Sequence, residues 1–138
     1  MRIFLDANVL VSVLNKEYPL FTYSARIVSL ADNTRFSVYT SPVCLAIAFY
    51  FAEKKSGTLP AKRKMEILAS KLSIANVGKD QVLQTLQNKK VNDFEDGIEY
   101  YAALSCNCEA IITEDISDFY FASIPILSSR AFIEKHLF

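Results

Sequence analysis

Cysteine and histidine are too scarce in this sequence for a disulfide framework or a zinc site built from both residue types. The chain has three cysteines, Cys44, Cys106 and Cys108, and no two of them form a CxxC pair. The single histidine, His136, lies far from them along the chain. An odd number of cysteines without such pairs is typical of a reducing compartment. We therefore expect a cytoplasmic protein with free thiols.

Glycine and proline are also scarce, and long hydrophobic runs are missing. Three glycines and four prolines, together with 51% hydrophobic residues, exclude a low-complexity or disordered chain. The apolar opening segment, residues 1–15, contains Asp6 and Asn8, so we expect neither a membrane span nor a signal peptide there. No repeat or linker is visible. The length fits one globular domain, residues 1–138, without membrane association.

Positive charge is missing from one long segment, although the net charge of the chain is zero. Residues 91–118 contain eight acidic side chains and no lysine or arginine. Basic side chains gather earlier, at Lys54, Lys55, Lys62, Arg63 and Lys64. A charge run is often only a solvated face, but a basic ridge can also guide a polyanion toward an acidic site. We hypothesise that these five residues bind nucleic acid.

Apolar residues recur along the chain with alternating strand and helix periodicities. Strands are predicted at residues 2–6, 35–41, 109–113 and 124–128, with a further short strand at 73–78. Helices are predicted at 7–15, 19–33, 42–55, 60–72, 79–89, 92–108 and 129–138. Strands that alternate with helices in this way favour parallel pairing with helices on both faces. We therefore predict a three-layer α/β/α sandwich around a central, mainly parallel sheet of four to five strands.

Acidic residues directly follow two of the predicted strands. Asp6 ends the first strand, and the segment TEDISDF, which contains Asp115 and Asp118, follows the strand at 109–113. The carboxyl ends of parallel strands lie at one edge of a sheet, where binding sites form. We expect these carboxylates to lie close together.

A helix brings a further carboxylate toward the same edge. The helix at 92–108 is predicted to be capped by Asn92 or Asp93, which places Asp96 in its first turn. Two carboxylates about 4 Å apart repel by roughly 4 kcal/mol at an effective dielectric constant of 20, so a cluster takes up protons or a cation. Oxygen ligands without thiolate or imidazole favour Mg²⁺ or Mn²⁺. Such a centre suits in-line hydrolysis of phosphodiesters.

Three motifs together resemble the PIN-domain ribonucleases. They are FLDANVLVSVL at the first strand, DFEDGIEYYAAL on a late helix and IITEDISDF after a late strand. The family pattern is a first-strand Asp with Asn two residues later, a helix-borne Asp and a Thr-x-Asp-x-x-Asp-Phe loop. The resemblance covers the chain from Arg2 to the last helix. It implies a PIN-like fold and a Mg²⁺- or Mn²⁺-dependent endoribonuclease that hydrolyses RNA.

The resemblance also implies roles for individual residues. Asp6, Asp96 and Asp115 would be metal-binding carboxylates, and Asp118 would be a further acid of the same catalytic site. Asn8 and Thr113 would hold these carboxylates in place. By resemblance to the commonest small PIN proteins, the chain could be the toxin of a toxin–antitoxin pair, inhibited by an antitoxin protein and forming a homodimer.

One family acid is absent from the sequence. PIN domains usually supply another acid, most often Glu, from the helix after the second strand, and here Ile47 occupies that place. Glu95 or Asp93 could compensate, although Asp93 is also explained as a helix cap and Glu95 as an exposed residue. The alternative reading is a catalytically weakened PIN-fold protein that binds RNA or a protein.

A phosphoacceptor receiver domain is a third reading, which the sequence disfavours. That reading requires an acidic pair after the first strand, and Asp6 has no acidic neighbour. It also requires a lysine at the end of a late strand, where Leu127 is followed by Ser128 and Ser129.

Overall fold

The computed structural model describes residues 1–137, in which five β-strands alternate with seven α-helices. The strands are β1 (Arg2–Leu5), β2 (Ser37–Thr40), β3 (Ser73–Ile74), β4 (Ala110–Ile112) and β5 (Ile126–Leu127). The helices are α1 (Ala7–Leu14), α2 (Phe21–Ser29), α3 (Pro42–Ser56), α4 (Thr58–Lys71), α5 (Lys79–Gln87), α6 (Phe94–Ser105) and α7 (Ser129–His136). Two short 3₁₀ helices, η1 (Leu30–Asp32) and η2 (Ile116–Phe119), complete the order.

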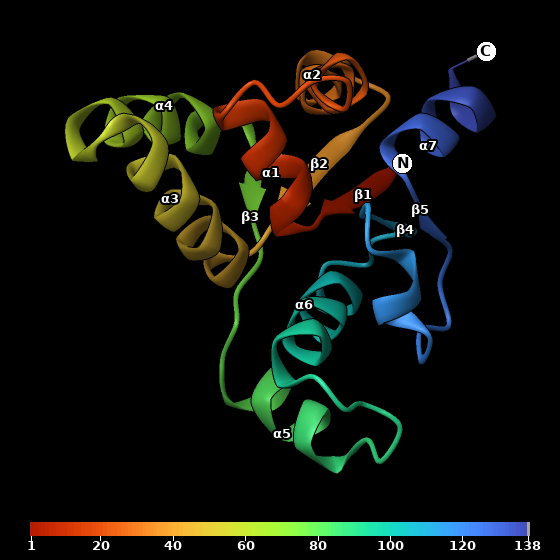
Figure 1. The fold of residues 1–138 in the computed structure, drawn as a ribbon. Coiled ribbons are helices and arrows are strands. Elements are labelled where there is room, and N and C mark those ends of the chain that lie inside the picture. Colours follow the sequence, from red (N-terminus) through yellow and green to blue (C-terminus); the bar gives the residue numbers. More distant parts are fainter. Residues whose placement is uncertain (138) are drawn as a thin grey trace.

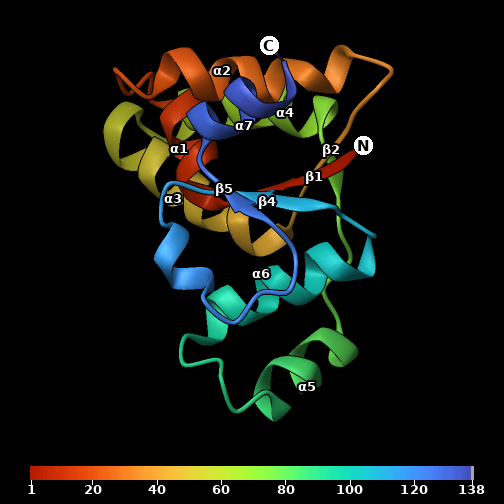
Figure 2. The same cartoon turned by 90° about the vertical axis from the view of Figure 1, so that its right-hand side faces the viewer.

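The five strands form one sheet in the order β3-β2-β1-β4-β5, and every pairing in it is parallel. Helices α2, α4 and α7 lie over one face of this sheet, and α6 lies under the other with α5 outside it (Figures 1 and 2). The predicted three-layer α/β/α architecture with a parallel sheet is therefore confirmed. In the register of β1 with β4, Leu5 pairs with Ile112, so the residues that follow these strands meet at one edge.

The centre of the core lies on β1 and β4. Ile3, Phe4 and Leu5 of β1 and Ile111 and Ile112 of β4 are all completely buried. Both faces of a central parallel strand are covered by helices, which explains why these strands are continuously apolar rather than alternating. Their rigid placement positions the polar residues that follow them.

Several predicted boundaries shift in the structure. The predicted helix 19–33 divides into α2 and the 3₁₀ turn η1, and the predicted helix 60–72 begins earlier, at Thr58. The predicted helix 92–108 is shorter because the Asp93 side chain accepts the amide of Asp96 as its N-cap, while Asn107 has a positive φ of 56° just after the helix. The last residue of the predicted helix 129–138 lies outside the described residues.

A glycine allows α5 to approach α6 closely. A Cβ atom at Gly97 would lie 2.4 Å from Cγ2 of Thr85 in α5 and 2.7 Å from Cγ1 of Val91. Real Cβ atoms do not approach heavy atoms this closely. Gly97 therefore fixes how α5 packs against the first turn of α6, which carries Asp96.

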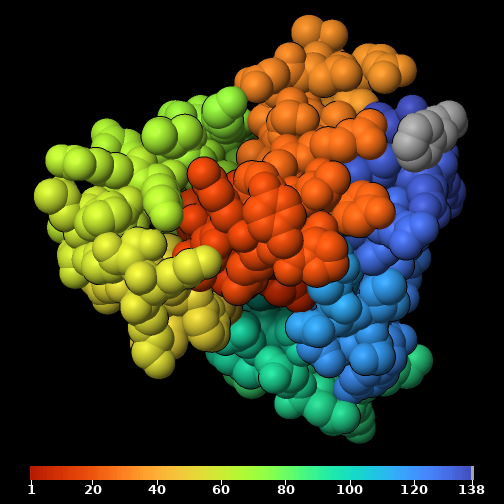
Figure 3. All heavy atoms as spheres, turned by 45° about the horizontal axis from the view of Figure 1, so that its top comes forward, coloured from red at the N-terminus to blue at the C-terminus, as the bar shows by residue number. Residues whose placement is uncertain are grey.

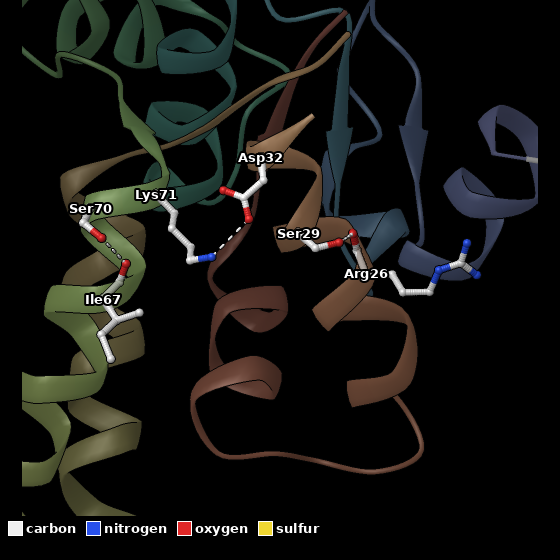
Figure 4. Close-up of polar contacts among 6 residues, drawn as sticks. All are labelled: Arg26, Ser29, Asp32, Ile67, Ser70 and Lys71. Carbon is white, nitrogen blue, oxygen red and sulfur yellow. Dashed lines mark hydrogen bonds and ion pairs between the residues drawn. The ribbon is translucent and has the colours of Figure 1, made fainter. Parts of the chain in front are cut away.

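Polar contacts also join α4 to the end of α2. Lys71 of α4 reaches Asp32 of η1, with 3.2 Å between Nζ and Oδ2 (Figure 4). In the same view, the Ser29 and Ser70 hydroxyls donate to carbonyls one turn earlier in their own helices. An exposed ion pair such as that of Lys71 with Asp32 contributes about 1 kcal/mol or less to stability.

Within residues 1–137, none of the helices has the length and apolar character needed to cross a membrane.

Candidate metal centre

Asp6 is both the N-cap of α1 and a member of the acidic site. Its Oδ1 accepts the amide of Ala7 at 2.7 Å, and its Oδ2 accepts the hydroxyl of Thr113 at 2.7 Å. Only 7% of the residue is exposed. The helix cap and the hydroxyl together hold the Asp6 carboxylate in one orientation at the carboxyl end of β1.

Asn8 and Thr113 connect Asp6 to Asp115. The Asn8 amide nitrogen donates to Thr113 Oγ1 at 3.2 Å and to Asp115 Oδ2 at 3.1 Å, and it lies 3.5 Å from Asp6 Oδ2. Thr113 Oγ1 also accepts the amide of Asp115 at 3.0 Å, while Asn8 Oδ1 accepts the amide of Glu114 at 3.2 Å. The structure thus places Asn8 and Thr113 where they restrain two carboxylates.

Asp96 reaches the site from α6. The Asp93 side chain caps this helix by accepting the Asp96 amide at 3.1 Å. Asp93 is therefore a helix cap, which is one of the two roles considered for it from the sequence. Asp96 is half-buried, whereas Asp118 lies exposed on η2. The predicted acids therefore come from three separate parts of the chain.

These carboxylates line one cavity of about 420 Å³. Segments of α1, α3, α6 and η2 contribute to its wall. These segments border one another on the molecular face in Figure 3. No basic residue belongs to the described lining, which contains seven acids: Asp6, Glu17, Asp93, Glu95, Asp96, Asp115 and Asp118. The cavity therefore brings together all four acids predicted to form the site.

The electrostatics of the cavity favour binding of a cation. Burial, followed by the negative charges of Asp93, Asp118, Asp6 and Glu95, raises the pKa of Asp96 to about 7. Burial and nearby carboxylates also raise the pKa of Glu95 and of Asp118. A divalent cation among these oxygens would stabilise the charged forms that the cavity otherwise disfavours.

A family model described as PIN domain matches residues 2–117. The chain belongs to the PIN-domain family. The predicted membership is therefore confirmed, and the expected metal-dependent ribonuclease role is consistent with it. Ribonuclease VapC1 of Aquifex aeolicus (strain VF5) is 26% identical over 141 residues, which cover 97% of this chain and 94% of that protein.

Solved structures of similar proteins show the same fold. VapBC-1 from nontypeable Haemophilus influenzae matches with a TM-score of 0.71 and 16% identity, over 94% of this chain and 99% of that one. VapBC2 from Rickettsia felis, bound to a promoter DNA fragment, matches with a TM-score of 0.69 and 20% identity, over 93% and 98%. VapC20 of Mycobacterium tuberculosis, a toxin that cleaves the sarcin-ricin loop, matches with a TM-score of 0.66 and 17% identity, over 89% and 98%.

This PIN domain has an apolar wall where an acid was expected. Ile47 of α3 is half-buried and lines the cavity together with Phe51, one turn further along the helix. The described part of α3 brings no carboxylate into this lining. Any cation held here must take its ligands from the other walls.

The five basic residues of the predicted ridge have different surroundings. Lys55 and Lys64 donate to the carbonyls of Asn15 and Leu14, at the C-terminal end of α1. Lys54 lies over the ring of Tyr50 at 4.8 Å, while Lys62 and Arg63 are exposed on α4. Lys55 and Lys64 therefore also stabilise the fold. Of the five, only Lys54, Lys62 and Arg63 have no such contact with α1 within the described chain.

Glu99 is an acid near the site for which the sequence motifs predict no role. It lies one turn after Asp96 on α6 and is only 1% exposed. Its carboxylate, that of Asp6 and the thiol of Cys44 offer ligand atoms that all lie within 4.8 Å of one another. The sequence signal that pointed to Glu99 is its spacing from Asp96, because residues three apart on a helix share a face. That signal alone does not distinguish a buried acid from an exposed one.

Proposed function

We propose that this PIN domain is a divalent-metal-dependent endoribonuclease that hydrolyses phosphodiester bonds of RNA. The observation that carries the proposal is the convergence of Asp6, Asp96 and Asp115 on one cavity, with Asn8 and Thr113 restraining two of them. Family membership and the name of the A. aeolicus relative support the same activity.

The residues present fit a hard divalent cation. Carboxylate oxygens dominate the polar lining, which favours Mg²⁺ or Mn²⁺. Asp6, Asp96 and Asp115 would hold the ion. When bound, it would supply an activated water and stabilise charge on the leaving oxygen of the phosphodiester.

The protein contributes orientation and charge to this chemistry. The hydrogen bonds from Ala7 and Thr113 leave the Asp6 carboxylate little freedom to rotate, and Asn8 similarly restrains Asp115. Fixed ligands of this kind lower the cost of assembling a reactive geometry. Asp118, exposed at the rim, would accept a proton from water that enters the cavity.

Substrate approach is proposed to follow α3 and α4. Phe51 lines the cavity, and Lys54 follows it by one turn of α3, while Lys62 and Arg63 are exposed on the neighbouring helix α4. A positive path beside an acidic cavity would attract the phosphate backbone. We expect neutralisation of Lys54, Lys62 and Arg63 to weaken RNA binding and to flatten its salt dependence. Unchanged binding would contradict this path.

We also propose that the chain acts as the toxin of a toxin–antitoxin pair. The VapBC relatives motivate this proposal. An apolar cavity of about 390 Å³ between α1, α2 and α4, lined by Phe21, Ile67 and Leu68 among others, offers a surface for a protein. Sedimentation of the isolated chain would show whether it forms the proposed homodimer. Co-purification with the product of a neighbouring gene would test for an antitoxin.

The deciding experiment combines Mn²⁺ titration with RNA cleavage. We expect the parent chain to bind Mn²⁺ and to cleave RNA in its presence, and Asp96→Asn to lose both properties. Glu66→Gln, at an exposed acid of α4, is the control for a lost charge and should retain both. Absence of Mn²⁺ binding by a folded parent protein would contradict the ribonuclease assignment.

The apolar Ile47 favours one alternative, a PIN domain that binds RNA or protein without cutting. In that case the parent chain would bind RNA with equal affinity in EDTA and in Mn²⁺, and cleavage would not rise with Mn²⁺ concentration. Measuring both quantities on the same preparation separates the two functions.

A further inference from the structure

Glu99 lies in a place that is unusual for a glutamate. It is 1% exposed on α6, among the buried residues Ile98, Tyr100, Ala102 and Ala103. Acidic side chains are almost never fully buried unless they are paired. Its carboxyl group is directed toward Asp6, which lines the acidic cavity, and toward Cys44 of α3.

No positive group compensates this buried acid among the described residues that face it. The groups that influence Glu99 are Asp6 at the start of α1, Cys44 on α3 and Asp96 on α6 itself. Its Oε2 atom is buried and has no hydrogen-bond partner in the described chain. A buried oxygen without a hydrogen-bond partner is costly, and a cation that binds there in place of the proton would remove this cost.

The position of Glu99 also relates to the acid missing from α3. Ile47 follows Cys44 by one turn of α3, so the two side chains share a face of that helix. Ile47 lines the cavity where the family usually places its helix acid, and Cys44 faces Glu99. Glu99 thus approaches from α6 the region that the α3 acid would otherwise serve. Asp96 and Glu99, three residues apart, give α6 two carboxylates on one face.

We propose that Glu99 is an additional ligand of the divalent cation and supplies from α6 the carboxylate that other PIN domains take from α3. The inference rests on the proposed metal-dependent function. Asp6 and Glu99 would then both be ligands of the same ion. The centre would then have the number of acids that is usual in its family, with one of them on α6 instead of α3.

The test compares two isosteric Glu→Gln variants by Mn²⁺ titration calorimetry. Glu99→Gln should lower Mn²⁺ affinity tenfold or more, whereas Glu66→Gln, at an exposed acid of α4 outside the cavity lining, should lower it less than threefold. A glutamine at position 99 can still donate a hydrogen bond to Asp6. A role limited to orienting Asp6 therefore predicts unchanged affinity in Glu99→Gln, and that result would overturn the proposal.

A check of folding and a second Glu99 variant keep the outcomes separate. Circular dichroism and a metal-free melting temperature no lower than that of the parent would show that Glu99→Gln is folded. Glu99→Asp keeps the charge but retracts it, so it should bind Mn²⁺ more weakly than the parent and more tightly than Glu99→Gln. If the parent and Glu99→Gln bind Mn²⁺ equally while Asp96→Asn does not bind, only the Glu99 proposal fails. If the parent itself does not bind Mn²⁺, the proposed function fails with it.

Discussion

The hydroxyl of Thr113 donates a 2.7 Å hydrogen bond to Asp6 across 107 positions of sequence. The same oxygen accepts the amide of Asp115 and the side-chain amide of Asn8. One threonine therefore sets the relative placement of carboxylates that follow two adjacent strands. Because Thr113 is completely buried, its contribution is to geometry rather than to direct contact with RNA.

Replacing this threonine should weaken the metal centre without removing a ligand. Thr113→Val leaves Asp6 Oδ2 without its short hydrogen bond, and we expect Mn²⁺ affinity to fall by roughly 10- to 100-fold. Thr113→Ser retains the hydroxyl and should stay within a few-fold of the parent. Titration calorimetry on both variants checks this; equal affinity for the Val and Ser variants would contradict the role given to the hydroxyl.

Substitutions should show that Asp93 has a structural role and that Asp96 binds metal. Asp93→Ala removes the N-cap of α6 and should cost about 1 kcal/mol of unfolding free energy while Mn²⁺ still binds. Asp96→Asn should abolish binding but leave the metal-free protein at least as stable, because it removes a carboxylate whose pKa is raised to about 7. Urea unfolding in EDTA measures the stability of each variant, and titration measures its Mn²⁺ affinity. Loss of Mn²⁺ binding in Asp93→Ala, or retained binding in Asp96→Asn, would contradict these roles.

The packing of α5 on α6 gives a prediction about stability. Gly97→Ala places a methyl group against Thr85 and Val91, and we expect a loss of about 1–3 kcal/mol from the resulting strain. The matched control is Gly78→Ala, whose Cβ would meet only Gln81 Oε1, at 3.8 Å. Thermal unfolding should show a larger decrease for the first variant than for the second, which replaces the glycine N-cap of α5 but creates no clash.

The sequence predicted the parts of this molecule that local pattern determines. The apolar runs of β1 and β4 and the acids after them followed from periodicity and strand polarity. Asp6, Asp96 and Asp115 line one cavity because parallel strands and a helix N-terminus direct side chains to the same edge. For these residues the local sequence already specifies the direction of the side chain.

Glu99 could not be assigned in this way because its burial depends on tertiary packing. Helix α6 is covered by the sheet on one side and by α5 on another, so a face that would be solvated on a surface helix lies inside. The Glu99 carboxyl group meets Asp6, at the end of β1, and Cys44 of α3, and local periodicity does not show that these distant segments pack against α6. The acidic segment 91–118 therefore combined exposed, half-buried and buried acids that the sequence did not distinguish.

The buried Glu99 should make the metal-free protein less stable as pH rises. Burial, then hydrogen bonding and repulsion by Asp6, raises the pKa of Glu99 from 4.5 to about 11. Between these values the folded chain retains a proton that the unfolded chain releases, so unfolding free energy falls with rising pH, by up to about 1.4 kcal/mol per unit. Between pH 7 and 9, where Asp96 contributes less, Glu99→Gln should remove most of this slope. Urea unfolding in EDTA at several pH values would measure it, and equal slopes for parent and variant would contradict the prediction.

An acid restored on α3 should compensate for the loss of the acid on α6. Ile47→Glu places a carboxylate in the cavity wall, and in the Glu99→Gln background we expect it to recover Mn²⁺ affinity by tenfold or more. Ile47→Gln in the same background adds a similar volume without charge and should recover little. In the parent background, where Glu99 already supplies a carboxylate, Ile47→Glu should improve affinity less than it does in Glu99→Gln. Equal gains in the two backgrounds would mean that the two positions act independently, because only residues that serve the same ion are expected to be non-additive.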